Sequence, residues 1–275
     1  MAVKSILVHV TNSDQGRRRV EAALTLAAEH DAHVNGLGVS HEVSLPSIAG
    51  TRIPDSVIRD VEARQKADQG ETRKQFEDAA NRAGLANRIG WLEGRGVPSD
   101  IVGLYARYAD LTIIGQQPSS GPDAVEDAFA DMMVLRCGRP VIVFPHIGAP
   151  KPLGKHIVVA WNASREAARA VGDAMPLLEK SEQVTVLSVD PEGIGDLPGA
   201  DIAQHLARHN IKADVQHSAA SQVDAGDVLL NFVSDHGVDL VVMGAYGHSR
   251  VREMVLGGVT RHMLEHMTVP VLMSH

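Results

Sequence analysis

Two groups of glycines near the end of the chain are the residues whose type and spacing could do chemistry. Gly244-Ala-Tyr-Gly247 follows an apolar run, and nine residues separate Gly247 from Gly257-Gly258-Val259-Thr260. Because glycine has no Cβ, it lets backbone N–H groups approach an anion closely. A helix that begins near Val259 would add its unsatisfied N–H groups and the positive end of its dipole. The spacing therefore predicts a cradle for the phosphate groups of a nucleotide.

The glycine spacing differs from two widespread nucleotide loops. It is neither G-x-x-x-x-G-K-[ST], in which a lysine reaches the phosphates, nor the G-x-G-x-x-G turn of dinucleotide-binding proteins. Two arginines, Arg250 and Arg252, lie between the glycine groups, and a guanidinium can pair with a phosphate through two donors. We therefore expect a third class of nucleotide loop and include Arg250 in its site.

The elements that must position this loop follow a regular alternation. Short β-branched runs alternate with helical periodicity, which is typical of parallel sheets covered by helices. The expected strands lie near residues 4–10, 33–39, 88–93, 110–114 and 140–144, and then near 156–161, 184–189, 213–217, 239–243 and 270–273. The sequence therefore predicts an α/β protein of two tandem domains, each with an open five-stranded parallel sheet.

The two halves of the chain repeat one plan. Asp110-Leu-Thr-Ile-Ile-Gly115 corresponds to Asp239-Leu-Val-Val-Met-Gly244, and Arg139-Pro-Val-Ile-Val-Phe144 corresponds to Val269-Pro-Val-Leu-Met-Ser274. Between the halves, residues 146–154 are rich in proline and glycine, which break helices and strands. We therefore expect one domain at residues 1–147 and a second at residues 155–275.

The loop and the repeat together resemble the universal stress protein family. Its nucleotide-binding members carry G-x-x-G, nine residues and then G-[S/T], and Gly244, Gly247 and Gly257 fit that spacing. The opening of the second half, Ala160-Trp-Asn-Ala-Ser164, is similar as well. The resemblance covers both halves and implies a Rossmann-like fold. In this fold ATP or a related adenine nucleotide lies across the carboxyl ends of the strands, at the topological switch point.

Carried onto this chain, the resemblance implies a nucleotide site in the second half. Ala160, Trp161 and Asn162 would face the base and ribose, and Val189 would pack on the adenine. Any Mg²⁺ would be held by the phosphates. The residues expected around those phosphates are Met243, Gly244, Gly247, Arg250, Gly257, Gly258, Val259 and Thr260.

Two positions in the second half depart from the family pattern. Many ATP-binding members carry Asp in place of Asn162, and the amide keeps hydrogen-bonding capacity but lacks the charge. They also carry Ser or Thr in place of Gly258, which keeps its backbone N–H but supplies no hydroxyl. We expect that loss to cost about 0.5–1.5 kcal/mol, the net contribution of one hydrogen bond. Thr260 could offer a hydroxyl from farther along.

The first half of the chain departs further from the family's pattern of residues. When Pro140 is aligned with Pro270, Asp127 stands in place of Gly257 and Ala128 in place of Gly258. An aspartate that faces phosphates would repel them. We therefore predict one competent nucleotide site per chain, with the first half kept as a structural or partner-binding copy.

Charge and composition exclude several classes of partner. The formal charge of -8 and the pI near 5.9 argue against a nucleic-acid or anionic-membrane surface. We find neither an apolar run of the roughly 18–20 residues that span a bilayer nor a signal peptide, so we expect a cytoplasmic protein.

The single cysteine, Cys137, excludes an internal disulfide. His262-Met-Leu-Glu265-His266 matches the H-x-x-E-H zinc pattern, but no acidic ligand follows it, so we predict no metal site.

The leading hypothesis is a cytoplasmic stress-response protein in which nucleotide occupancy alters conformation or the choice of an unknown protein partner. A dedicated enzyme is not expected, because the sequence offers no placed general base, Walker lysine or acidic pair; slow hydrolysis of ATP stays open. One alternative is a nucleotide-independent interaction scaffold with both sites degenerate. Another is an adenylyl-transfer enzyme, although no S-G-G-x-x-S loop is present. A homodimer is expected through the apolar edges at residues 141–143 and 271–273.

Overall fold

Ten strands form the centre of the molecule. The computed structural model describes residues 2–40, 55–116, 128–147, 153–189, 199–218, 224–247 and 258–275. The strands of the first half are β1 (Ser5–Val10), β2 (His33–Ser40), β3 (Ile89–Arg95), β4 (Leu111–Gly115) and β5 (Val141–Phe144). Those of the second half are β6 (His156–Ala160), β7 (Gln183–Val189), β8 (Ala213–Ser218), β9 (Leu240–Gly244) and β10 (Val271–Ser274). All ten expected strands are confirmed, with ends within two residues of those predicted.

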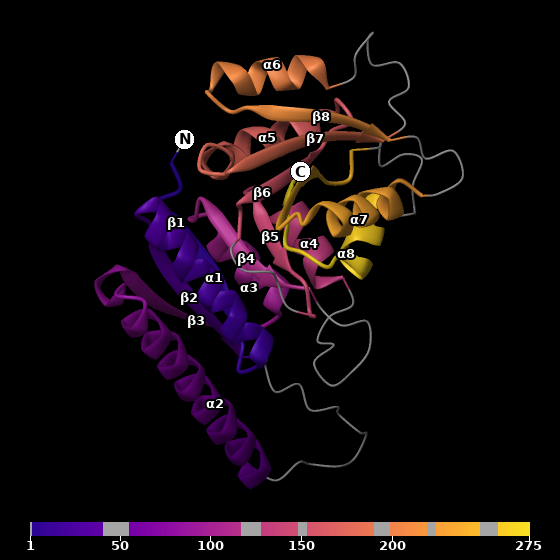
Figure 1. Cartoon of the computed structure of the whole chain (residues 1–275). Coiled ribbons are helices and arrows are strands. Elements are labelled where there is room, and N and C mark those ends of the chain that lie inside the picture. The colour runs from indigo at the N-terminus through magenta and orange to yellow at the C-terminus, as the bar shows by residue number, and fades with distance from the viewer. Residues whose placement is uncertain are drawn as a thin grey trace.

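The strands form one continuous sheet in the order β3-β2-β1-β4-β5-β10-β9-β6-β7-β8 (Figure 1). Neighbouring strands run parallel within each half, as predicted. The predicted α/β class is therefore confirmed. The segment expected to divide the domains includes residues 148–152, which lie outside the described residues.

Helices cover both faces of the sheet (Figure 1). The helices whose buried residues join one core are α1 (Asp14–His30), α2 (Asp55–Arg82), α5 (Arg165–Leu178) and α6 (Ala200–Arg208). Those of the opposite core are α3 (Pro98–Ala106), α4 (Phe129–Arg136), α7 (Ala225–His236) and α8 (Gly258–His266). A short 3₁₀ helix occupies Ala86–Arg88. Within β1, Ile6 and Val8 belong to the first core and Leu7 to the second, as the alternation of side chains along a strand requires.

The first helix of each half begins with the same signal. Ser13 caps α1 and accepts a hydrogen bond from Gly16 N at 3.0 Å, and Ser164 caps α5 and accepts from Ala167 N at 3.1 Å. Serine at this position satisfies one of the N–H groups that a helix start leaves unpaired. Both helices therefore start directly after the first strand of their half.

The halves are joined by β5 and β10, which pair antiparallel. Val271 lies opposite Val143, and Met273 lies opposite Val141, with all four side chains fully buried. These are the two edges that we expected to pair between chains, and that expectation is wrong, because they pair within one chain. Tethering holds the two edges at high effective concentration, so the intramolecular pair wins over the intermolecular one. A homodimer of this chain would need another surface.

None of the helices in the described part of the chain combines the length and the apolar character that crossing a membrane requires.

Candidate functional site

The topology brings the predicted site together where β6 lies between β7 and β9. Ala160 pairs with Leu187 on one side and with Met243 on the other, so all three strands end at one edge of the sheet. After β6 the chain turns into α5, and after β9 it continues through Gly244-Ala-Tyr-Gly247. Such a switch point leaves a crevice at the carboxyl ends of parallel strands.

The predicted site residues divide between the two faces of this edge. Met243 is buried in the core that α7 and α8 share, and Ala160, Val189 and Val259 are half-buried against the same core. Trp161 packs against the opposite core, on the side of α5. Trp161 and the other apolar site residues therefore pack against different cores, and contact of Trp161 with a base stays a prediction.

Asn162 shapes the turn that follows β6. Its Oδ1 accepts a hydrogen bond from Ser164 N at 3.1 Å, an Asx turn that precedes the helix cap. The turn places Ala163 at a φ of +56°, in the left-handed region. Asn162 itself is exposed, so the part of its amide that the turn leaves unused remains accessible.

Gly244 and Gly247 allow the loop after β9 to pass close to the first turn of α5. A Cβ on Gly244 would lie 2.4 Å from Ala167 N and 2.5 Å from the Glu166 carbonyl carbon. Both distances are far below van der Waals contact, so the packing of α5 requires glycine here whether or not an anion binds. A Cβ on Gly247 would lie 2.9 Å from Glu166 Oε2 and 3.5 Å from Ser164 Oγ.

Glu166, which the sequence analysis did not single out, lies beside this loop. Its side chain is 4% exposed. Oε1 accepts a hydrogen bond from Arg165 Nε, and the buried Oε2 has no hydrogen-bond partner in the described part of the chain. Burial acts to raise the pKa of this carboxyl, but the hydrogen bond from Arg165 and a backbone hydrogen bond outweigh it, and the pKa lies below its usual value. The carboxylate is therefore ionised at neutral pH. An acid in the first helical turn after the opening strand was the signal available in the sequence.

Tyr246 ties the same loop to two other elements. Its backbone has a φ of +57°, and its N–H donates to Thr260 Oγ1 at 3.4 Å. The phenol donates to Asp131 Oδ1 on α4 of the first half, and burial together with that contact raises the pKa of Tyr246. Thr260 is buried, so its hydroxyl lies inside the protein as an acceptor for the loop. A phosphate contact from Thr260 stays a prediction.

The start of α8 is open. Gly258 is the first residue of this helix and is exposed, and among the described residues an added Cβ would have no neighbour within 4 Å. Free N–H groups at such a helix start can bind an anion. Two of the predicted phosphate contacts, Arg250 and Gly257, lie outside the described residues.

The corresponding place in the first half is filled by protein. Arg19 is buried and donates to Thr11 Oγ1 at 2.9 Å, and a Cβ on Gly115 would lie 2.1 Å from Arg19 Nη1. Burial lowers the pKa of Arg19 to about 10. Gln116, which follows Gly115, donates to the carbonyl oxygens of Leu264 and Glu265 at the end of α8, at 2.8 and 3.0 Å. Asp127 lies outside the described residues, and Ala128 caps α4 with a φ of +81°.

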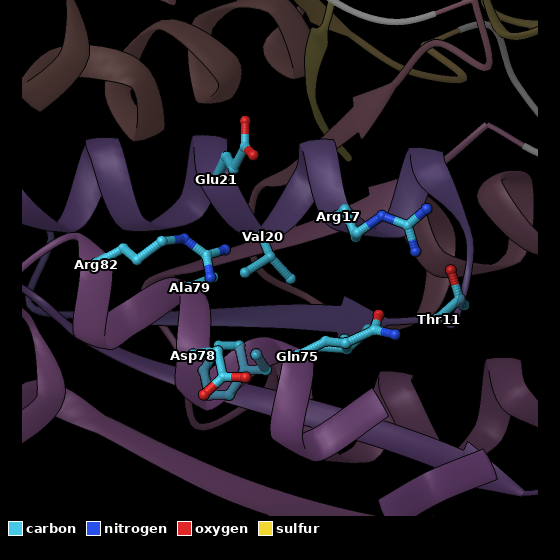
Figure 2. A pocket seen from close by; sticks show the side chains of 10 residues that line it. Thr11, Arg17, Val20, Glu21, Gln75, Asp78, Ala79 and Arg82 are labelled. Atoms are coloured by element: carbon cyan, nitrogen blue, oxygen red, sulfur yellow. The ribbon is translucent and has the colours of Figure 1, made fainter. Parts of the chain in front are cut away.

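The first half holds a separate cavity of about 120 Å³ between α1 and α2, which the sequence did not predict. Figure 2 shows side chains of both helices around it, with Thr11 at the end of β1. Its walls combine apolar residues with two arginines and two acids: Val10, Val20, Phe76, Ala79, Arg17, Arg82, Glu21 and Asp78. The mixed charges give it no clear preference for an anion or a cation.

The H-x-x-E-H pattern on α8 does not assemble a metal site. His262 Nε2 lies 2.9 Å from Asp227 Oδ1 on α7, and His266 Nε2 lies 3.9 Å from Glu265 Oε2. In the described ranges no three His, Cys, Asp or Glu side chains are grouped so that they could hold a metal ion.

Comparison with known proteins gives one family. Residues 154–275 match the model of the universal stress protein family. A universal stress protein of Synechocystis sp. is 32% identical over 83 residues, which are 30% of this chain and 27% of that protein. The matched region thus spans about a quarter of that relative.

Two solved structures share the fold over nearly the whole chain. A universal stress protein from Archaeoglobus fulgidus is 17% identical with a TM-score of 0.73, and the match covers 98% of this chain and 97% of that one. A functionally unknown protein from Pseudomonas aeruginosa is 13% identical with a TM-score of 0.59, over 99% and 92% of the two chains. At these identities the likeness concerns the fold. The second half of the chain, residues 154–275, therefore contains a domain that matches the universal stress protein family.

Proposed function

We propose that this protein is a cytoplasmic stress-response protein that binds ATP or another adenine nucleotide in its second half and acts as a regulatory binding module. The observation that carries the proposal is the edge of the sheet at β6 and β9. There the exposed Asn162 amide, the loop at Gly244–Gly247 and the open start of α8 belong to neighbouring elements. An amide, a glycine loop and a helix start are groups that recognise a nucleotide's polar edge and phosphates.

The structure of the first half favours a single nucleotide site per chain, in the second half. Arg19 occupies the space beside Gly115, and Gln116 is engaged with α8 of the second half. A nucleotide at that edge would have to displace both. We propose that the first half instead supports the second and contacts a protein partner.

The proposal is tested by calorimetric titration of ATP with Mg²⁺ into nucleotide-stripped protein. The wild type is expected to bind one ATP per chain, and Gly247→Asp is expected to lose binding, because it adds a second carboxylate beside Glu166. Gly70→Asp is the matched control, since a Cβ at Gly70 on α2 meets nothing within 4 Å. Asn162→Ala, at an exposed position, provides a milder variant with weakened binding.

Two further measurements complete the test. Thermal unfolding of each variant separates loss of the site from loss of the fold. Light scattering of the full chain tests the homodimer, which would have to use a surface other than β5 and β10.

The alternative is a nucleotide-independent interaction scaffold. This alternative is favoured by the close packing of Gly244 against α5, because that packing already requires a glycine without any role in binding phosphate. Absence of any ATP binding by the well-folded wild type would leave this alternative and direct the search to protein partners by pull-down.

A further inference from the structure

The unpartnered oxygen of Glu166 is the feature of the second half that a nucleotide site alone does not explain. The residue is the second of α5, its side chain is 4% exposed, and Oε2 is buried without a hydrogen-bond partner among the residues that the structure describes. Oε2 lies close to Gly247, since a Cβ added to that glycine would be 2.9 Å from Oε2. Oε2 therefore faces the backbone of the loop that is expected to hold the phosphates.

An ionised carboxylate in this position opposes a free polyphosphate. Arg165 engages the other oxygen, Oε1, and its own side chain is 87% exposed, so much of its charge is screened by water. Buried negative charge is screened less, so Oε2 would repel phosphate oxygens brought to the same loop. The site needs positive charge between Glu166 and the nucleotide.

A divalent cation meets this need. Mg²⁺ is bound in proteins through one or two carboxylates together with substrate phosphates and water. Ser164 Oγ faces the same loop, because a Cβ on Gly247 would lie 3.5 Å from it. The described residues provide no group of three metal-binding side chains, so in this inference the nucleotide phosphates supply further ligands.

We propose that Glu166 is the protein's own ligand for a divalent cation that enters the second-half site together with a nucleoside polyphosphate, so that the site takes the metal–nucleotide complex in preference to the free nucleotide. This inference rests on the proposed function and deepens it. It also replaces the expectation that the phosphates alone hold the cation.

The test compares ATP affinity in MgCl₂ and in EDTA for the wild type, Glu166→Gln and Glu265→Gln. Glutamine keeps the size of the side chain and removes its charge. Glu265 is the matched control, because it is a half-exposed acid on α8 that pairs with Arg261. The wild type and Glu265→Gln are expected to bind ATP at least tenfold more weakly in EDTA than in MgCl₂. Glu166→Gln is expected to bind ATP with similar affinity in both solutions, and more tightly than the wild type does in EDTA.

A second measurement uses the wild type alone and does not depend on how a variant folds. Mn²⁺ as a probe is expected to give a protein-bound electron paramagnetic resonance signal with ATP present and almost none without it. Equal ATP affinity of the wild type in MgCl₂ and EDTA would overturn the inference, as would an unchanged Mg²⁺ dependence in folded Glu166→Gln. In both cases the proposed nucleotide site would stand. Absence of ATP binding to the wild type under either condition would instead remove the proposed function, and the inference with it.

Discussion

Ala163 adopts a φ of +56° between β6 and α5, a conformation that costs a residue with a Cβ about 1–2 kcal/mol. Ala163→Gly is therefore expected to stabilise the protein by about 1 kcal/mol, after allowance for the greater freedom of glycine in the unfolded chain. Urea unfolding measures the change. Ala168→Gly, at an exposed position in the interior of α5, is the control and is expected to destabilise by about 1 kcal/mol. A change in the free energy of unfolding with the same sign in both variants would contradict the assignment of strain to Ala163.

Gly258 lies at the start of α8, where an added Cβ meets no atom of the described ranges within 4 Å. Gly258→Ser would supply the hydroxyl that many ATP-binding members of the family carry there. We expect a gain of about 0.5–1.5 kcal/mol, or roughly two- to thirteenfold in ATP affinity, measured by calorimetry. Gly172→Ser on α5, also at an open position, should leave affinity unchanged. A decrease with Gly258→Ser would place the phosphates away from this helix start.

Single residues show where sequence reasoning reached its limit. The glycine spacing predicted a loop at residues 244–247, but the requirement for glycine at 244 comes from α5, which only the fold places beside it. Glu166 was missed for a related reason. An acid in the first turn of a helix is ordinarily explained by the helix dipole, and its approach to Gly247 depends on the pairing of β6 with β9.

At the scale of elements, the repeated acids Asp110 and Asp239 have an identified role in starting the strands. Both Asp239 oxygens accept backbone hydrogen bonds, from Gly154 and Lys155 on one side and from Lys155 and His156 on the other, at 2.6–3.1 Å. For Asp110 the hydrogen bonds within the described ranges go to Oδ2, which accepts from Lys4 N and Ser5 N at 2.9 and 3.0 Å. Each acid therefore ties the start of one parallel strand to its neighbour, which explains why the repeat includes it.

This difference predicts unequal effects of the same substitution. In Asp239→Asn an NH₂ group must replace one accepting oxygen and face backbone N–H donors in a buried place, so we expect a loss of about 2–3 kcal/mol. In Asp110→Asn the amide can turn its oxygen to both donors, so the loss should stay below about 1 kcal/mol. Denaturant unfolding of both variants measures the two losses. Similar losses would show that the second Asp239 oxygen contributes little.

The order of the elements was predictable and their mutual contacts were not. Apolar β-branched runs and the Ser13 and Ser164 caps mark strands and helices because these signals are local. The left-handed turns at Ala128 and Ala163 lack the usual glycine signal. Their backbone conformation follows from packing, which a local pattern does not contain.

The whole molecule is held together across the two halves by more than the β5–β10 pair. Tyr246 contacts Asp131, Gln116 binds the end of α8, and Arg169 donates to Gly138 O at 3.1 Å. Two of these ties, those of Tyr246 and Gln116, involve the residues that follow β9 and β4. The sequence predicted two separate sheets, and their fusion escaped it because two apolar edges alone do not specify which edge pairs with which.

The outer edges of the fused sheet differ from the joined ones. β3 carries Glu93 and Arg95, and β8 carries Asp214, with half-buried and exposed residues along both strands. Charged edge strands resist pairing with another chain. The apolar β5 and β10 are the strands that need a partner, and each receives it from the other.

The isolated second half should therefore self-associate. A fragment of residues 153–275 would expose β10, whose four residues are all buried in the full chain, as an unpaired apolar edge. We expect the fragment to dimerise through antiparallel β10 pairs that replace the β5–β10 pair, and the full chain not to dimerise through this strand. Light scattering over a range of concentrations measures both species, and circular dichroism establishes that the fragment is folded. Because the β5–β10 seam predicts this difference directly, a folded fragment that stays monomeric at every concentration would show that the seam adds little to the cohesion of the halves.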